Sequence, residues 1–357
     1  MKPKLISNYI AWQVIKSILL VLFIILGLYA FTSFIGELND IGQGNYGLWR
    51  AFSYVLLTLP LNIYSLFPMI VLIGSLIGLG LMASHNEINV MRAAGVSVGR
   101  IVSTVLMASI ILIAVASVIG EGFGPSLSYF ADQQKAIAQS GGQATQTENG
   151  MWLRDANDFI YINKILPGSH LKGLSIFHFN NNLQLQTAGY AKSASYQHGQ
   201  WYLHNLVTTH YTNPSKTTVT SDDQQIWHAE IDPKSFGFFS LDAQMMSLTK
   251  LAEFIHYQDE NDLSSTQYSF VFWQRIFQPL ATLVMILLAL PFVFGSMRTM
   301  TMGLRVVIGV LFGCVFFLLN RFLGSFSLVF QVPPFFAALL PIFLFSMLAL
   351  WLTRRAS

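Results

Sequence analysis

Long apolar runs are the feature that most restricts what this chain can fold into. They recur six times, and each has the roughly 20 residues or more that a helix needs to cross a bilayer. Only 10% of the residues are charged, against about 25% in soluble domains. We therefore predict an α-helical polytopic membrane protein with six transmembrane helices. The predicted spans cover about residues 17–36, 51–83, 100–121, 268–297, 306–324 and 335–352.

Two of these runs have features of their own. The first follows Lys2 and Lys4 and lacks a small-residue cleavage site, so it is expected to be retained as a span rather than removed as a signal peptide. The second is too long for one straight crossing. Because Pro60, Asn62 and Pro68 interrupt it, we expect a kinked helix or an interfacial entry segment there.

The orientation follows from lysine and arginine near the span ends, which concentrate on the cytoplasmic side. One side holds nine such residues: Lys2, Lys4, Lys16, Arg92, Arg100, Arg298, Arg305, Arg354 and Arg355. The other side holds Arg50 in a short loop, with Arg275 and Arg321 just inside the span ends. We therefore expect both termini in the cytoplasm and the large insert after the third span on the opposite side.

A short polar stretch, residues 84–95, lies between the second and third runs. Ser84 and Glu87 match an S-x-x-E capping box, which would begin a helix there. Gly95 suits the left-handed position just past a helix end, and Ile88 and Met91 share one face. We predict a helix of two to three turns outside the hydrocarbon that receives force from a separate protein.

The insert is predicted to be a β domain. Runs such as Phe159–Ile165 and Leu174–Phe179 are rich in β-branched and aromatic residues. Short strands at regular spacing suggest a sandwich, jelly roll or open barrel. Apolar residues on both faces of 159–165 indicate either a strand buried on both sides, which we favour, or a surface that holds an apolar ligand. The predicted domains are residues 1–130 (spans one to three with the helix at 84–95), 131–262 (the β domain) and 263–357 (spans four to six).

Enzymatic chemistry finds little support in the sequence. It lacks H-E-x-x-H, G-x-S-x-G and cysteine–histidine metal spacing. The stretch at 95–100 also lacks the lysine and the spacing of a phosphate loop. We expect no cofactor or metal in this chain, and any ATP and magnesium would be bound by a partner subunit. The net charge of +3 is too small to indicate nucleic-acid binding.

Several stretches together resemble the LptF/LptG family, the permease subunits of the lipopolysaccharide exporter. They include Phe67-Pro68-Met69, the glycine-rich run at 76–80, the stretch at 87–95, Ile276-Phe277-Gln278-Pro279-Leu280, the stretch at 302–307 and Pro333-Pro334. The loop at 42–46 and Gly120-Glu121 are more similar to the LptG branch than to the LptF branch. The resemblance covers essentially the whole chain.

The resemblance implies a multi-pass protein of the Gram-negative inner membrane, with six spans and a periplasmic β-jellyroll. In this family an LptF–LptG pair assembles on a dimer of the ATPase LptB and extracts lipopolysaccharide from the outer leaflet. The lipid then passes along jelly-roll domains toward LptC and LptA. Lateral gates form between the first span of one permease and the fifth span of the other. The cytoplasmic helix docks on LptB, and its acidic residue corresponds to Glu87. The predicted ATPase-coupling residues are Ser84, Glu87, Ile88, Met91, Arg92 and Gly95.

Lipopolysaccharide has several acyl chains and anionic phosphates, so its cavity needs an apolar wall and a cationic rim. The candidates for lipid contact are Leu26, Tyr29, Phe316 and Phe317 for the wall, and Lys135, Arg275 and Arg321 for the rim. Each arginine has an ordinary alternative, since arginines near span ends usually extend to the interface. The family also carries lysines before the glycine-rich loop, where this chain has Ser33, Asn39 and Asp40.

Two other classes of membrane protein remain open. A protein of the ABC type that only relays ATPase motion, without moving lipid, would also suit an external domain and a cytoplasmic docking helix. A secondary transporter usually contains internal repeats and ionisable residues deep in its spans, and the sequence has neither.

Overall fold

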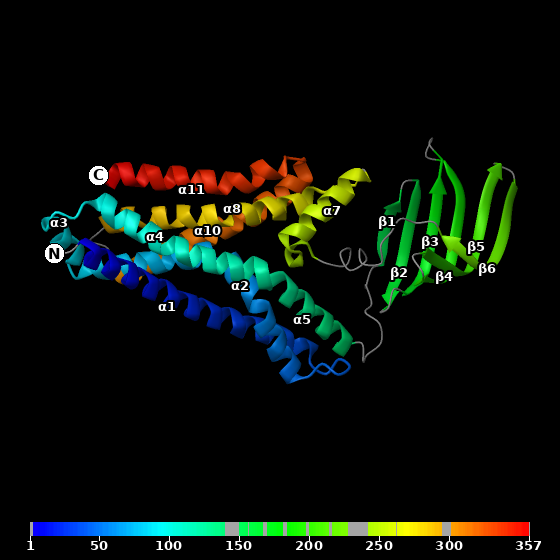
Figure 1. Ribbon diagram of the computed structural model, residues 1–357, viewed down its shortest axis with the longest axis horizontal. Coiled ribbons are helices and arrows are strands. Elements are labelled where there is room, and N and C mark those ends of the chain that lie inside the picture. Colours follow the sequence, from blue (N-terminus) through cyan, green and yellow to red (C-terminus); the bar gives the residue numbers. More distant parts are fainter. Residues whose placement is uncertain are drawn as a thin grey trace.

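A computed structural model describes residues 3–139, 150–155, 157–166, 170–180, 184–197, 200–213, 216–227, 242–261, 263–294 and 301–356. Lys2 and Arg298, two of the residues used to predict orientation, lie outside the described residues. The described chain forms a helical bundle and one β-sheet (Figure 1). Both termini and the short helix α3 (Glu87–Ala93) lie at one end of the bundle, and the sheet lies beyond the other end (Figure 1). These two ends are called the α3 end and the sheet end.

The described chain has six helical stretches that are long and apolar enough to cross a membrane, which confirms the predicted number. They are α1 (Pro3–Glu37), α2 (Leu48–Ser84), α4 (Val98–Ser117) continued by the π-helical turn η2 (Val118–Phe123) and by α5 (Gly124–Gln139), α8 (Thr266–Ala289) followed by α9 (Pro291–Phe294), α10 (Met302–Phe330) and α11 (Pro334–Ala356). Shorter elements are η1 (Leu38–Asp40), η4 (Ala243–Met245) and α7 (Leu248–Glu260).

Helix α2 occupies the centre of the bundle. In its most apolar stretch 72% of the residues are buried, against 11% in α1 and 22% in α10. α2 is continuous over 37 residues, with Pro60 and Pro68 inside it, so the second span is a single helix, and a kink at these prolines stays a prediction. At 1.5 Å per residue it is about 55 Å long, well beyond the hydrocarbon thickness of about 30 Å. The second span thus reaches from the α3 end to the sheet end.

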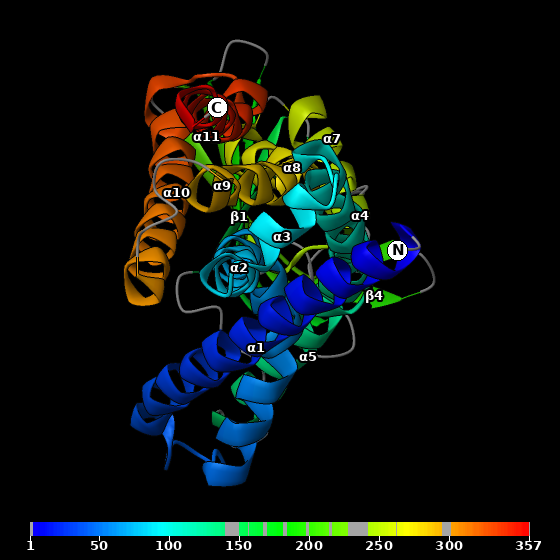
Figure 2. The same ribbon diagram turned by 90° about the vertical axis from the view of Figure 1, so that its left-hand side faces the viewer.

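Glycines bring α1 and α10 close to α2. A Cβ atom at Gly74 of α2 would lie 2.6 Å from the Cα of Ile18 in α1, and one at Gly309 of α10 would lie 2.8 Å from Cδ1 of Leu76. Gly78 and Gly313 repeat these two contacts one turn further on, against Ser17 and Met69. Figure 2 looks onto the α3 end and shows α2 between the other two helices. In a bilayer, where lipid tails are as apolar as the side chains, such small-residue contacts hold helices together.

The described strands of the insert confirm the predicted β domain and form one six-stranded antiparallel sheet in sequence order. The strands are β1 (Met151–Asp155), β2 (Asp158–Leu166), β3 (His170–Phe179), β4 (Leu185–Gln197), β5 (Gln200–Asn213) and β6 (Lys216–Trp227). These strands run as a meander, each paired with its sequence neighbour.

Both faces of this sheet carry apolar side chains. Ile160 and Ile162 are at most 1% exposed and pack with Trp201 on one face. Phe159 points to the other face and lies against Phe179, with ring centroids 5.3 Å apart. On that face four aromatic side chains line an open hollow of about 360 Å³: Trp152, Phe159, Phe177 and Phe179. The double apolar pattern of 159–165 therefore reflects a core on one face and an aromatic hollow on the other.

The range predicted for the β domain, residues 131–262, contains helix as well as strand. Residues 131–139 continue the helix α5, and α7 occupies Leu248–Glu260, so both ends of the range 131–262 contain helix. The described strands cover only residues 151–227. A polar composition lowers hydropathy in helices as well as in strands, which is why hydropathy alone placed these helical ends in the β domain.

Substitution of Gly74 by leucine should destabilise the bundle, because the added side chain would collide with the backbone of α1. Overpacking of this kind costs about 1–3 kcal/mol, so we expect thermal melting in detergent to fall by on the order of 5 °C. Gly27→Leu is the matched control, since nothing lies within 4 Å of its added Cβ atom. Equal melting temperatures of the two variants would contradict the close α1–α2 contact.

Candidate functional site

Helix α3 begins differently from the capping box that the sequence suggested. Ser84 is the last residue of α2, and its hydroxyl donates to the Leu81 carbonyl, 2.9 Å away. The chain then turns through Asn86, which has a left-handed backbone (φ +59°) and precedes Glu87. Glu87 is in the first turn but makes no reciprocal cap with Ser84. The capping-box prediction was wrong because the hydroxyl is used within the preceding helix.

The end of α3 agrees with the prediction. Gly95 has φ +87°, and two backbone hydrogen bonds close the turn: Val96 N–H to the Met91 carbonyl and Gly95 N–H to the Arg92 carbonyl, both 3.0 Å. This is the Schellman arrangement, which a left-handed glycine permits without strain. A defined stop of this kind keeps the seven-residue helix short and in one orientation.

The inner face of α3 packs into the bundle. Ile88 is only 4% exposed and belongs to an apolar cluster drawn from several membrane helices, with Met91 packed against it. The hydroxyl of Tyr9 in α1 donates to Oε2 of Glu87, 3.0 Å away. Several outward side chains remain exposed: Asn89, Val90 and Arg92. Thus α3 is held by the bundle on one face, with one hydrogen bond to α1, and is open on the other.

The predicted lipid contacts on α1 and α10 differ in exposure. Leu26 and Tyr29 are half-buried, whereas Arg321 is exposed and Phe317 is 45% exposed. Phe316 instead is 6% exposed and packs edge-on against Phe345 of α11, with ring centroids 5.2 Å apart. Adjacent residues on a helix point about 100° apart, and here Phe316 faces α11 while Phe317 is exposed. Lipid contact at these positions stays a prediction.

Lys135 lies at the sheet end, where α5 brings it to the end of the first span. Its ammonium is 2.8 Å from carboxylate oxygens of both Glu37 and Asp40. Tyr46 donates a 2.6 Å hydrogen bond to Glu37. Burial, followed by this contact with Glu37, raises the pKa of Tyr46, so its hydroxyl stays protonated as a donor. A cation from the third span thus lies beside two carboxylates at the end of the first span.

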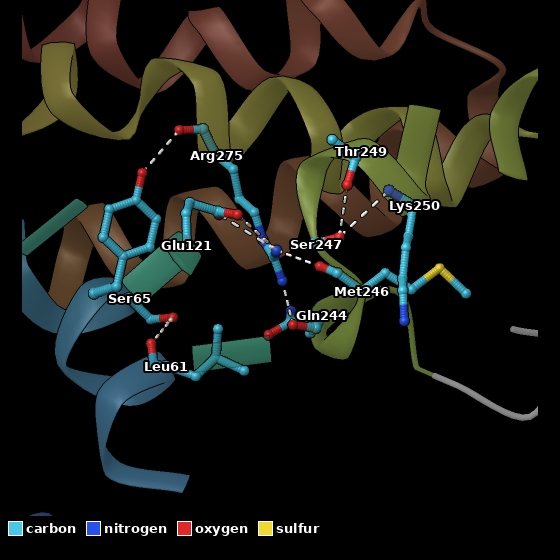
Figure 3. A network of polar contacts seen from close by, with 10 residues as sticks. Leu61, Ser65, Glu121, Gln244, Met246, Ser247, Thr249, Lys250 and Arg275 are labelled. Carbon is cyan, nitrogen blue, oxygen red and sulfur yellow. Dashed lines mark hydrogen bonds and ion pairs between the residues drawn. The ribbon is translucent and has the colours of Figure 1, made fainter. Parts of the chain in front are cut away.

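Arg275 of α8 is the most enclosed of the predicted rim residues, at 8% exposed. Its guanidinium lies 3.3 Å from Glu121 in η2 and donates to the carbonyls of Met246 and Gln244, in the segment between the sheet and α7 (Figure 3). All these partners belong to the protein. Direct lipid contact by Arg275 would therefore require these partners to be displaced.

Two prolines explain the polar contacts between α2 and α8. Proline lacks an N–H, so Pro68 leaves the Tyr64 carbonyl of α2 without its helical donor, and Pro279 does the same to the Arg275 carbonyl of α8. Each helix supplies the missing donor to the other. The Gln278 amide donates to the Tyr64 carbonyl (2.9 Å), and the Tyr64 hydroxyl donates to the Arg275 carbonyl (3.1 Å). We call these two hydrogen bonds the proline brace.

The roles of Tyr64, Glu121 and Gln278 were not predicted from the sequence. The motifs around Pro68 and Pro279 were both recognised, but neither motif indicates that a side chain of the other supplies its missing donor. Glu121 was visible as a carboxylate at the end of an apolar run, a position where a partner is usually required. The structure brings these residues together around Arg275 and Tyr64, whereas α3 lies at the end of the bundle away from the sheet (Figure 1).

Replacing Gln278 by leucine should leave the buried Tyr64 carbonyl without a donor. An unsatisfied buried acceptor costs about 1–3 kcal/mol, so thermal melting of the purified protein should fall. Gln274→Leu, one turn earlier on the same helix and half-buried, is the matched control and should melt close to the original protein. If both leucine variants lost the same stability, the proline brace would not be the cause.

The chain can also be placed among known proteins. A family model described as "Lipopolysaccharide export system permease LptF/LptG" matches residues 8–355. The chain is 34% identical to the lipopolysaccharide export system permease protein LptG of Escherichia coli (strain K12) over 354 residues, which covers 99% of this chain and 98% of that protein. It is 32% identical to LptG of Haemophilus influenzae over 353 residues, 98% of each. The chain therefore belongs to the LptF/LptG family of lipopolysaccharide export permeases.

Proposed function

We propose that the chain is the permease subunit of an ATP-driven ABC-type exporter. It would extract lipopolysaccharide from the outer leaflet of the inner membrane and pass it to a periplasmic jelly-roll bridge. Membership of the permease family supports this function, and the LptG proteins of Escherichia coli and Haemophilus influenzae match along almost their whole length. The observation that carries the mechanism is the attachment of α3 to α1 by the hydrogen bond from Tyr9 to Glu87.

In this proposal the α3 end faces the cytoplasm and the β domain faces the periplasm. Lysine and arginine near the span ends favour that orientation. The partners would be a homologous permease, LptF, a dimer of the ATPase LptB, and LptC with LptA on the periplasmic side. ATP and magnesium would bind to the ATPase dimer, and this chain would act as the transport subunit.

Force would enter through α3. The outward side chains of α3, together with Ser84, Glu87, Arg92 and the turn at Gly95, would contact the ATPase. Ile88 and Met91 pack inward and would carry the displacement to the start of α1. α2 leads directly into α3 and touches α10 through Gly309 and through Arg305, which donates to the Gly80 carbonyl (2.8 Å). A shift of α3 would therefore reach both α1 and α10, the helices expected at the lateral gates.

Lipid would meet the exposed faces of α1 and α10. We assign apolar contacts to Leu26, Tyr29 and Phe317 and a phosphate contact to Arg321, because these residues are at least partly accessible. Phe316 would help to position Phe317 by packing against Phe345 of α11. Lys135 and Arg275 are each paired with carboxylates, so they would contact a phosphate only by exchange of those partners.

Purification of the full chain in detergent, with identification of every bound component, tests the proposal. We expect an ATPase dimer, one homologous permease and lipopolysaccharide, and ATP-dependent release of lipopolysaccharide after reconstitution. Recovery of the ATPase without lipid, and without lipid crosslinks from the first and fifth spans, would favour a relay that moves no lipid. Recovery of the chain without an ATPase would overturn the ATP-driven mechanism.

Glu87→Lys should weaken assembly with the ATPase or uncouple ATP hydrolysis from lipid release, because it reverses the charge on the surface of α3. The matched control is Glu253→Lys on α7, where the glutamate is exposed at the other end of the molecule. Copurified ATPase and lipid released per ATP are the measurements. Release equal to that of the original protein would refute a role for Glu87.

Tyr9→Phe separates the two proposed roles of Glu87, which are contact with the ATPase and the hydrogen bond to α1. It keeps the aromatic ring and the carboxylate but removes the hydrogen bond to α1. Assembly with the ATPase should therefore be retained while lipid released per ATP falls. Loss of assembly in Tyr9→Phe would mean that the hydrogen bond only shapes the docking surface.

A further inference from the structure

The chain that returns from the β domain to the membrane helices is held by side chains of the third and fourth spans just before α7. This segment, residues 244–248, connects η4 to the first residue of α7. Met246 and Leu251 are fully buried in an apolar cluster that also contains Val271 of α8. Next to this cluster lie two side chains of opposite charge, Arg275 and Glu121, whose side chains are 8% and 17% exposed.

Arg275 binds the backbone of the segment, because its guanidinium donates to the carbonyls of Gln244 and Met246. Glu121 lies 3.3 Å from the same guanidinium and so holds its charge beside these two carbonyls (Figure 3). The positive residue thus holds the segment, and the negative residue holds the positive one.

The two charged residues are themselves tied to the centre of the bundle. The backbone carbonyl of Arg275 accepts from Tyr64 of α2. Gly120, beside Glu121, packs directly on the Tyr64 ring, where any Cβ atom would collide. Glu121 also lies in η2, a π-helical turn in the third span. Such turns interrupt the regular helix and are frequent at functional positions.

We propose that Arg275 and Glu121 are positioning residues that form a clamp on residues 244–248 and set the orientation of the β domain relative to the membrane helices. The second, third and fourth spans meet at the clamp, so their movements are passed to the base of the β domain. Only this last consequence, for lipid transfer, rests on the proposed function.

The arrangement makes a prediction that an ordinary ion pair would not. If attraction between the charges were all that mattered, exchanging them in Glu121→Arg/Arg275→Glu would restore the contact. In the clamp, the exchange would point a carboxylate at the two carbonyls that accept from Arg275. A carboxylate cannot donate to a carbonyl, so the double variant should remain defective.

The test is a distance measurement in the full-length chain. Spin labels at Ser126→Cys of α5 and Thr218→Cys of β6, both exposed, report the orientation of the sheet after Cys314 is replaced by serine. We expect a narrow distance distribution for the original clamp. It should lose its single narrow peak in Glu121→Gln, Arg275→Lys and the exchanged double variant. The matched control, Glu253→Gln on α7, should retain the peak.

Two results would overturn the clamp: a narrow peak retained in Glu121→Gln and Arg275→Lys, or its recovery in the exchanged variant. Both single variants nearly preserve side-chain size, and the melting temperature of each identifies any loss of folding. If one of them does not fold, the other still decides. The distances need neither lipid nor ATPase. If the clamp variants broaden the distribution and the original protein exports no lipid, the clamp is supported and the proposed function is rejected. If the variants keep the narrow peak and the original protein exports lipid, the clamp is rejected and the proposed function is supported.

Discussion

The proline brace between α2 and α8 is the interaction on which the rest of the bundle depends. A bilayer interior offers no water to a carbonyl that has lost its helical donor, so a neighbouring helix must supply one. Here the requirement is mutual: the Gln278 side chain serves the carbonyl freed by Pro68, and the Tyr64 hydroxyl serves the carbonyl freed by Pro279. Together, the two hydrogen bonds prevent α2 from sliding along α8 and from rotating against it.

The brace also explains why other contacts gather at the sheet end. Tyr64 fills the space that Gly120 leaves open in η2, and Arg275 directs its side chain to the chain returning from the sheet. α2 then continues through the bundle to the α3 end, where its last turn leads into α3. One helix therefore connects the surface proposed for the ATPase with the base of the β domain.

The same central helix relates the two expected gate helices to each other. α1 and α10 expose most of their apolar surface, yet each approaches α2 closely at paired glycines. Helices in lipid gain little from apolar contact alone, so close packing at small residues determines where they associate. The exposed remainder of α1 and α10 is free for lipid or for a second permease. Each helix therefore has one side packed on α2 and one open side, which is consistent with gate helices that move together with α2.

Much of the architecture was predictable from the sequence, because hydropathy and strand periodicity are local properties. The chain by itself determined six spans, a β insert after the third, and a short helix ended by a left-handed Gly95. It could not determine that the Ser84 hydroxyl would bond within α2, since a serine at that position can either cap the helix that follows or bond to a carbonyl of the helix that precedes it. Nor could it pair Arg275 with Glu121, 154 residues away, or with the brace on Tyr64, 211 residues away. Those pairings depend on which helix faces meet, and only the tertiary packing decides which buried donor reaches which freed carbonyl.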